Sequence, residues 1–556
     1  MRVELAMASP APAAAPVAIT RRWRLDRYEA LLLAVFAAIS AWVLALDLWQ
    51  VVVHHRVWTG TDGFFVVDQL QYLAWISAAS HHVLASNLFV LRPTPADYFQ
   101  PAVAVSGLVS RLGVAPWLSL LLWKPVAVLG MFFGTRAYIY RSLNWRSERR
   151  VALTLALFFG SFSIVYGAFG VVGDLFPGFL SWGYPFGLMA LAAMMYGLLR
   201  YDRDRRTGSV SWVPPTLGAL ASLLHPWQGE LMVTIVVVAE LLRWREWRAW
   251  RGTVRTRLAL PLVTLLGTGL PLLYYMVLGH VDLSWGLARE ASKHTFSFWS
   301  LLLAMAPLAI VAALGYRGPS KTFLTTVTRS WPLAALIVYV LSASAVSATP
   351  LHAFEGITVP LSILAVTGVQ RARWTRVPYR RVIIGALIAL LTIPATAYEL
   401  ASARDYMAPQ AGNANFITRD ERAALDYLAR DRDPGGVLTR FYLGALVPGR
   451  TGRRTFVGNC LWSEPQCVPR AQMAQRLFDG TLSPAAAQAF VAQSGARFIL
   501  TDCQARSDLR GSLGPMIVSI ARFGCASVIE LGATGHPAGP LAESDVNAAV
   551  RAPRRQ

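Results

Sequence analysis

Asp68 stands just after the first long apolar run of the chain, and its surroundings suit proton transfer. Gln71, Tyr72 and Trp75 follow it at i+3, i+4 and i+7, which places them on the same face of a helix. A carboxylate in that position can take a proton from a hydroxyl group, while aromatic rings stack on the face of a sugar. The alternative interpretation is an interfacial aspartate beside an aromatic belt.

Two further aspartates belong to neighbouring loops. Asp174 lies in a Gly-Asp-Leu-Phe-Pro segment and is a candidate second acid, or a residue that orients the acceptor; a turn aspartate is the alternative. Asp62 lies in a Thr-Asp-Gly segment that is typical of a turn.

Two short polar segments interrupt the apolar runs. One contains His225 and Glu230, and the other contains His352 and Glu355. Polar groups at membrane depth are costly and usually face a cavity. Each segment could be a structural cap, but their occurrence on the same side of the membrane favours a shared polar cavity that binds substrate.

Basic residues that could hold a lipid phosphate are few in the outer loops. Arg289 and Lys293 are spaced i, i+4 on an expected helix and project together, with His294 next to them. Arg92 is a further candidate. Cations at headgroup level can bind phosphate, and the alternative is an ordinary interfacial anchor. Lys124 lies inside an apolar run and must snorkel or pair with an acid.

The composition is that of a polytopic membrane protein. Of 556 residues, 55% are hydrophobic and only 15% are charged, and the mean hydropathy is +0.43. A spanning helix needs about 20 apolar residues. The chain offers about eleven candidate spans: 29–53, 116–140, 151–169, 181–199, 212–225, 228–243, 257–278, 299–316, 331–348, 357–370 and 380–398.

The formal net charge of +21 is distributed in short clusters between the apolar runs. Those clusters fall on alternate loops, which indicates the positive-inside rule rather than nucleic-acid binding. We therefore expect residues 1–28 to be a cytoplasmic tail, followed by a signal anchor rather than a cleavable signal peptide. An odd number of spans places residues 399–556 outside, on the outer face of a bacterial cytoplasmic membrane.

The remaining domain organisation follows from these spans. Residues 29–398 form the transmembrane domain, with long outer loops at 54–115 and 279–298, and we expect surface helices in the first of them. Residues 399–536 alternate short β-type runs (436–439, 454–458, 496–500 and 526–531) with helical stretches (468–478 and 484–494), which predicts a small α/β domain. Thr418 precedes a helix with an acidic first turn, although we do not take its capping-box spacing as complete. Residues 537–556 are expected to be a disordered tail.

All four cysteines, Cys460, Cys467, Cys503 and Cys525, lie in this last domain. Four cysteines outside the membrane part suggest two disulfides in an oxidising compartment, whereas four reduced thiols would indicate a cytoplasmic domain. Three connectivities are possible. We favour Cys460–Cys467 and Cys503–Cys525, because each pair is close in sequence.

The arrangement resembles the GT-C superfamily of integral-membrane glycosyltransferases over residues 29–398. Those enzymes use polyprenyl-phosphate-linked sugars and keep an essential acid in the first outer loop, where Asp68 lies. The resemblance implies an inverting transfer to a glycan, lipid or protein acceptor. Asp68 would act as general base, and Arg289 and Lys293 would stabilise the leaving phosphate. Many members have paired acids in this loop, whereas Gln69 follows Asp68, so we expect no metal and no other cofactor.

Two other functions remain open. A transporter or flippase of lipid-linked glycans would carry charges inside its spans and have broken helices in paired repeats. Here the polar residues concentrate in the loops, which favours the enzyme. The third possibility is a non-catalytic envelope assembly protein with an outer binding domain.

Overall fold

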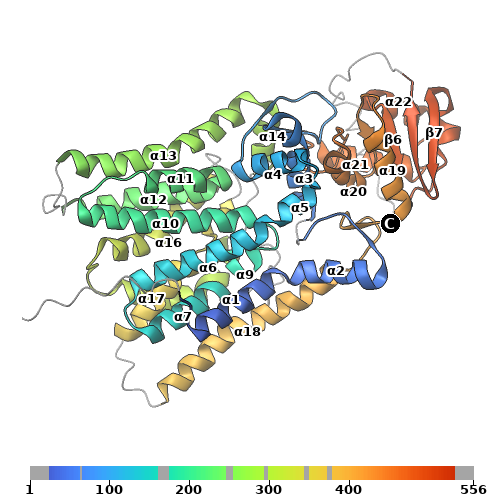
Figure 1. Ribbon diagram of the computed structural model, residues 1–556. Coiled ribbons are helices and arrows are strands. Elements are labelled where there is room, and N and C mark those ends of the chain that lie inside the picture. Colours follow the sequence, from blue (N-terminus) through green and yellow to red (C-terminus); the bar gives the residue numbers. More distant parts are fainter. Residues whose placement is uncertain are drawn as a thin grey trace, which may run out of the picture.

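The computed structural model describes residues 24–62, 66–160, 175–245, 254–292, 298–343, 350–371 and 379–532. A helical bundle occupies one end of the molecule, and a smaller unit of helices and strands, residues 407–532, occupies the other (Figure 1). We call this smaller part the C-terminal unit. The expected disordered tail, 537–556, lies outside the described residues.

The first predicted span, 29–53, is two helices rather than one. Helix α1 (Arg27–Ser40) begins with a capping box in which the side chain of Asp26 accepts from the backbone of Glu29. Helix α2 (Trp42–His54) follows with a bend of 50° at Ala41. Asp26 also pairs with Arg146 and Arg150 in the first turns of α7 (Arg146–Phe158), so the cap ties the start of α1 to the start of that helix.

Apolar helices occur at all the predicted spans, but eleven crossings are not confirmed. Six described helices or helix combinations are long and apolar enough to cross a membrane, and the bent α1–α2 pair would be a seventh. Helices α7, α11 and α12 have only 13, 12 and 17 residues, fewer than the about 20 that spanning takes. The bundle helices after α2 are α5 (Pro116–Leu121), α6 (Trp123–Ser142), α7 (Arg146–Phe158), α9 (Pro177–Leu180), α10 (Pro185–Thr207), α11 (Val213–Leu224), α12 (Pro226–Leu242), α13 (Val254–Val281), α15 (Phe298–Ala313), η5 (Leu314–Tyr316), α16 (Phe323–Ala343), η6 (Pro350–Phe354), α17 (Thr358–Arg371) and α18 (Arg380–Tyr406).

Lys124, the cation inside an apolar run, pairs with the carboxylate of Asp62. Both side chains are about nine-tenths buried. The sequence indicated that Asp62 is a turn residue. The structure shows that its side chain also forms an ion pair. Because breaking a buried pair leaves an uncompensated charge, this contact fixes the start of the first long loop on α6.

That first long loop contains two helices, α3 (Val66–His82) and α4 (Pro101–Arg111), together with β1 (Val57–Trp58), β2 (Ala85–Ser86) and β3 (Ala96–Tyr98). Strands β2 and β3 pair with each other. Helix α14 (Leu283–Ala291) comes from the other long loop. Figure 1 shows α3, α4 and α14 between the bundle and the C-terminal unit. Helix α3, which carries Asp68, is therefore packed from both sides.

The C-terminal unit has a mixed four-stranded sheet in the order β5-β6-β8-β7. Its strands are β5 (Val437–Leu438), β6 (Phe498–Thr501), β7 (Ile517–Phe523) and β8 (Ala526–Leu531), and only β5 and β6 are parallel. Its helices are α19 (Arg419–Arg430), α20 (Phe441–Thr451), α21 (Cys467–Phe478), α22 (Pro484–Ser494) and α23 (Leu509–Leu513), with the 3-10 turn η8 (Gly514–Met516). The predicted run 454–458 makes one bridge, from Thr455 to Val437, instead of a strand.

Two local predictions for this unit are corrected or confirmed by the structure. The capping box of α19 is complete, because Thr418 and Glu421 each accept from the other's backbone, contrary to our expectation. Cys460–Cys467 and Cys503–Cys525 form the two disulfides, so the favoured connectivity is confirmed.

The C-terminal unit is attached to the first long loop by paired backbone and side-chain contacts. Strand β4 (Phe416–Ile417) pairs with β1. The Arg454 guanidinium donates to the backbone carbonyls of Asn87 and Arg92. Helix α20 packs closely on α3, where a Cβ added at Gly449 would meet Leu73 at 3.0 Å. The loop and the C-terminal unit thus form one packed assembly.

Candidate functional site

Asp68 lies in the first turn of α3, where the helix dipole favours negative charge. Its Oδ2 accepts a hydrogen bond of 2.9 Å from the Tyr184 hydroxyl. Burial raises the pKa of the Asp68 carboxyl, while the Tyr184 hydrogen bond and the charge of His352 act in the opposite direction. A carboxylate whose pKa lies closer to neutrality is a better general base at physiological pH.

A cluster of His225, His352 and Glu355 lies next to this pair. Nδ1 of His352 is 2.5 Å from Oε1 of Glu355, and Nδ1 of His225 is 3.4 Å from Oε2. The Gln228 amide donates to the same Oε2 at 3.0 Å. All three residues of the cluster are buried, and Glu355 is fully buried.

The local sequence explains why these side chains meet. His225 occupies the break between α11 and α12, where Pro226 begins the second helix. His352 lies in η6, and Glu355 lies in the turn between η6 and α17, which Gly356 allows because its φ is +71°. The structure therefore brings the two predicted polar segments together.

Tyr184 connects Asp68 to the cluster. Its ring centroid is 5.4 Å from that of His352 and 6.4 Å from that of His225. Tyr72 lies one turn after Asp68 on α3. Burial and the charges of Asp68 and Glu355 raise the pKa of its hydroxyl. We call Asp68, Tyr72, Tyr184, His225, Gln228, His352 and Glu355 the polar network.

Gln71 and Trp75 point elsewhere, although they were predicted to bind substrate with Asp68. The Gln71 amide oxygen accepts from Asn459 of the C-terminal unit at 3.2 Å. Trp75 is buried in a cluster of rings, with centroids 4.6 Å from Tyr98, 5.9 Å from Trp285 and 5.3 Å from Trp462. In this structure both side chains hold α3 against its neighbours.

The remaining predicted residues are only partly described. Arg289 lies on α14, and Arg92 donates to Ser284 of the same helix at 3.5 Å. Glu230 lies in the N-terminal part of α12 and is half-buried. Lys293, His294 and Asp174 lie outside the described residues.

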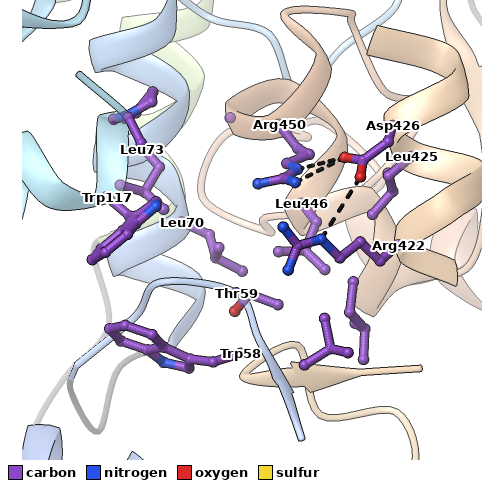
Figure 2. Close-up of a pocket in the computed structure, with 15 residues that line it drawn as sticks. Trp58, Thr59, Leu70, Leu73, Trp117, Arg422, Leu425, Asp426, Leu446 and Arg450 are labelled. Atoms are coloured by element: carbon purple, nitrogen blue, oxygen red, sulfur yellow. Dashed lines mark hydrogen bonds and ion pairs between the residues drawn. The ribbon is translucent and has the colours of Figure 1, made fainter. Parts of the chain in front are cut away.

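A separate cleft of about 240 Å³ opens on another face of α3, against the C-terminal unit. Trp58 and Trp117 form one wall, and Arg422 and Arg450 form the other (Figure 2). Asp426 accepts two hydrogen bonds from Arg450, of 3.1 and 2.8 Å. Leu70 and Leu73, rather than Asp68, line this cleft, so it does not belong to the polar network.

Sequence reasoning did not include Tyr184 and Gln228 among the site residues. Gln228 stands three positions after His225, inside the same polar segment, so the density of polar residues was the available signal. Tyr184 is separated from Asp68 by 116 positions, and nothing local indicates its partner.

The overall arrangement matches solved structures of an archaeal enzyme. The apo oligosaccharyltransferase of Archaeoglobus fulgidus aligns with a TM-score of 0.52 and 12% identity, covering 88% of this chain and 71% of that chain. The two chains therefore share a fold, which is the kind of fold that the GT-C resemblance led us to expect. The same oligosaccharyltransferase tethered to an acceptor peptide with the NVT sequon aligns with a TM-score of 0.50 and 14% identity, covering 88% and 71%. AglB of that organism, in complex with an inhibitory peptide and a dolichol-phosphate, aligns with a TM-score of 0.50 and 13% identity, covering 92% and 75%.

No family model matches the chain, and no curated protein matches it. The likeness to known proteins therefore rests on the three-dimensional fold, over 88–92% of the chain.

Proposed function

We propose that the chain is a multi-pass membrane glycosyltransferase that transfers a sugar from a polyprenyl-phosphate donor to a glycan, lipid or protein acceptor. Transfer takes place on the outer face of a bacterial cytoplasmic membrane. The observation that carries the proposal is the Asp68–Tyr184 hydrogen bond at the edge of a buried polar network, within a GT-C fold. The structures with a bound acceptor peptide and a dolichol-phosphate belong to a protein of that fold and support this substrate class.

The reaction is an inverting single displacement. Asp68 removes the proton from the acceptor hydroxyl, whose oxygen attacks the anomeric carbon of the donor as the bond to the lipid phosphate breaks. The Tyr184 hydroxyl holds the Asp68 carboxylate in place through its 2.9 Å hydrogen bond. Positioned proton transfer of this kind contributes about 10²- to 10⁴-fold to a rate.

Phosphate departure is assigned to the cations around α14. Arg289 on this helix and Arg92 beside it bring two guanidinium groups to one helix. A guanidinium binds phosphate through two parallel hydrogen bonds and remains charged at any physiological pH. Arg289, Arg92, Lys293 and His294 therefore stabilise the negative charge that develops on the lipid phosphate.

The test is Asp68→Asn in full-length protein purified in detergent, with transfer of labelled sugar measured from a panel of polyprenyl-phosphate-linked donors. We expect the loss of about 10²- to 10⁴-fold in rate that removal of a general base causes. Asp405→Asn, at an exposed site near the end of α18, is the matched control and should transfer normally. Unchanged transfer by Asp68→Asn contradicts the base assignment. If the wild type transfers sugar from none of the donors, the result contradicts the proposed transferase activity and favours a transporter or an assembly protein.

A further inference from the structure

The cluster of His225, His352 and Glu355 has the ligand chemistry of a transition-metal site. One donor atom from each residue lies within 4.8 Å of the other two. Two imidazoles with one carboxylate are a ligand set that suits zinc and related divalent ions. In the second such group among the described residues, Asp420 meets Cys503 and Cys525, whose sulfurs are already joined in a disulfide.

The distances within the cluster agree with a shared ion. Zinc bonds of about 2.0–2.1 Å at a tetrahedral angle separate two ligand atoms by about 3.4 Å. Nδ1 of His225 and Oε2 of Glu355 are 3.4 Å apart. Nδ1 of His352 is closer to Oε1, at 2.5 Å, so this ring has to move outward to accommodate a metal.

The charge balance of the site requires a cation or a proton. Glu355 is fully buried, and within the described ranges no Arg or Lys forms an ion pair with it. Asp68 adds a second carboxylate to the same polar network through Tyr184. Two neutral imidazoles cannot offset two negative charges, and uncompensated buried charges are expensive.

Two buried polar atoms without hydrogen-bond partners also support a bound cation. Nδ1 of His225 and Oε1 of Gln228 are buried without a hydrogen-bond partner. An imidazole nitrogen aimed at a carboxylate without a hydrogen bond is satisfied when a metal ion lies between them. Gln228 Nε2 meanwhile donates to Oε2 of Glu355, the kind of outer contact that orients a ligating carboxylate.

We propose that His225, His352 and Glu355 bind one divalent transition-metal ion of the zinc class, held in place by Gln228. The ion neutralises the buried carboxylates and fixes the break between α11 and α12 against the turn after η6. Its ligands differ from the Asp68 motif, for which the sequence indicated no metal. The proposal does not depend on the proposed transferase activity, because metal binding is measured directly.

The experiment uses full-length protein in detergent, stripped with a chelator and titrated with Co²⁺ and Zn²⁺. We expect the visible absorption of tetrahedral Co²⁺ to saturate at one equivalent, and elemental analysis to find one zinc per chain. Gln228→Leu should weaken binding about 10- to 100-fold, as the loss of an outer-shell partner does. His225→Gln should abolish the absorption, whereas His280→Gln, a histidine on α13 that bonds only its own helix, should bind as the wild type does.

Glu355→Gln supplies an independent variant in case His225→Gln does not fold, since it keeps the side-chain size and removes the anionic ligand. Both variants are compared with the wild type by their elution and by retention of the two disulfides. A wild type that takes up no Co²⁺ overturns the proposal. So does undiminished binding in folded His225→Gln or Glu355→Gln, because the metal would then lie elsewhere.

Discussion

Replacing Tyr184 by Phe tests the assignment of Asp68 with a change of one hydroxyl group. The ring of Tyr184 stays against His352, while the 2.9 Å hydrogen bond to Asp68 is removed. A hydrogen bond to a charged group contributes about 1.5–3 kcal/mol, and each 1.36 kcal/mol of activation free energy is about tenfold in rate. We therefore expect kcat/KM to fall by about 10- to 100-fold at the pH where the bond matters most.

The dependence on pH distinguishes this effect from a loss of structure. The Tyr184 hydroxyl stabilises the charged form of Asp68 and thereby lowers its pKa. Without it the pKa rises, so the acid limb of the profile of kcat/KM against pH moves to higher pH. The loss of activity should be greatest at low pH and shrink as the pH rises.

The assay is transfer of labelled sugar from a polyprenyl-phosphate donor between pH 5 and 9, with thermal unfolding measured alongside. Tyr196→Phe is the matched control. Tyr196 is a partly buried tyrosine on α10, the helix that begins directly after Tyr184. An unshifted acid limb in Tyr184→Phe would refute the reasoning, even if the overall rate fell, because a merely structural defect lowers the rate at every pH.

Three further predictions concern stability. Trp75→Ala removes a ring that contacts four others, and we expect it to destabilise the protein by about 3–5 kcal/mol. The loss should appear as a lower thermal midpoint in detergent, and Trp75→Phe should lose less. Burial and the charge of Asp282 raise the pKa of Asp97 to about 6. Because the folded state then holds a proton that the unfolded chain releases, the free energy of unfolding should fall as the pH rises from about 4 to 6. Asp97→Asn should flatten this slope. Replacing Cys503 and Cys525 together by Ser opens a loop with a sequence separation of 22 and should cost about 3 kcal/mol, while an unchanged midpoint would contradict an ordered C-terminal unit held by that bond.

Much of the fold could be predicted because membrane helices and short-range disulfides depend on local sequence. Within the described residues, each predicted span contains helix, since a run in lipid must satisfy its own backbone hydrogen bonds. The bend at Ala41 could not be predicted, because neither proline nor glycine marks it. Helix α20 was missed because it contains Pro448, Gly444 and Gly449, which weaken the helical pattern.

The sequence predicted which segments contribute to the candidate site, but it did not predict which side chains contact one another there. Polar clusters at the ends of apolar runs identified His225, His352 and Glu355, since such groups must face one another or a cavity. Helical periodicity also placed Gln71 and Trp75 on the same face as Asp68. Periodicity does not predict which residues of other elements these side chains contact. Their contacts include Asn459 and Trp462, nearly 390 positions away, and only the docking of the C-terminal unit brings those two residues to α3.

The packing of α20 on α3 has a consequence for how this protein can be divided. Helix α3 carries Asp68 on one face and receives α20 on another, at the close approach of Gly449 to Leu73. The C-terminal unit consequently helps to position α3 and its Asp68. It cannot be exchanged between related chains as an independent domain. A chimaera would have to carry α3 and β1 together with the unit, because both elements contact it directly.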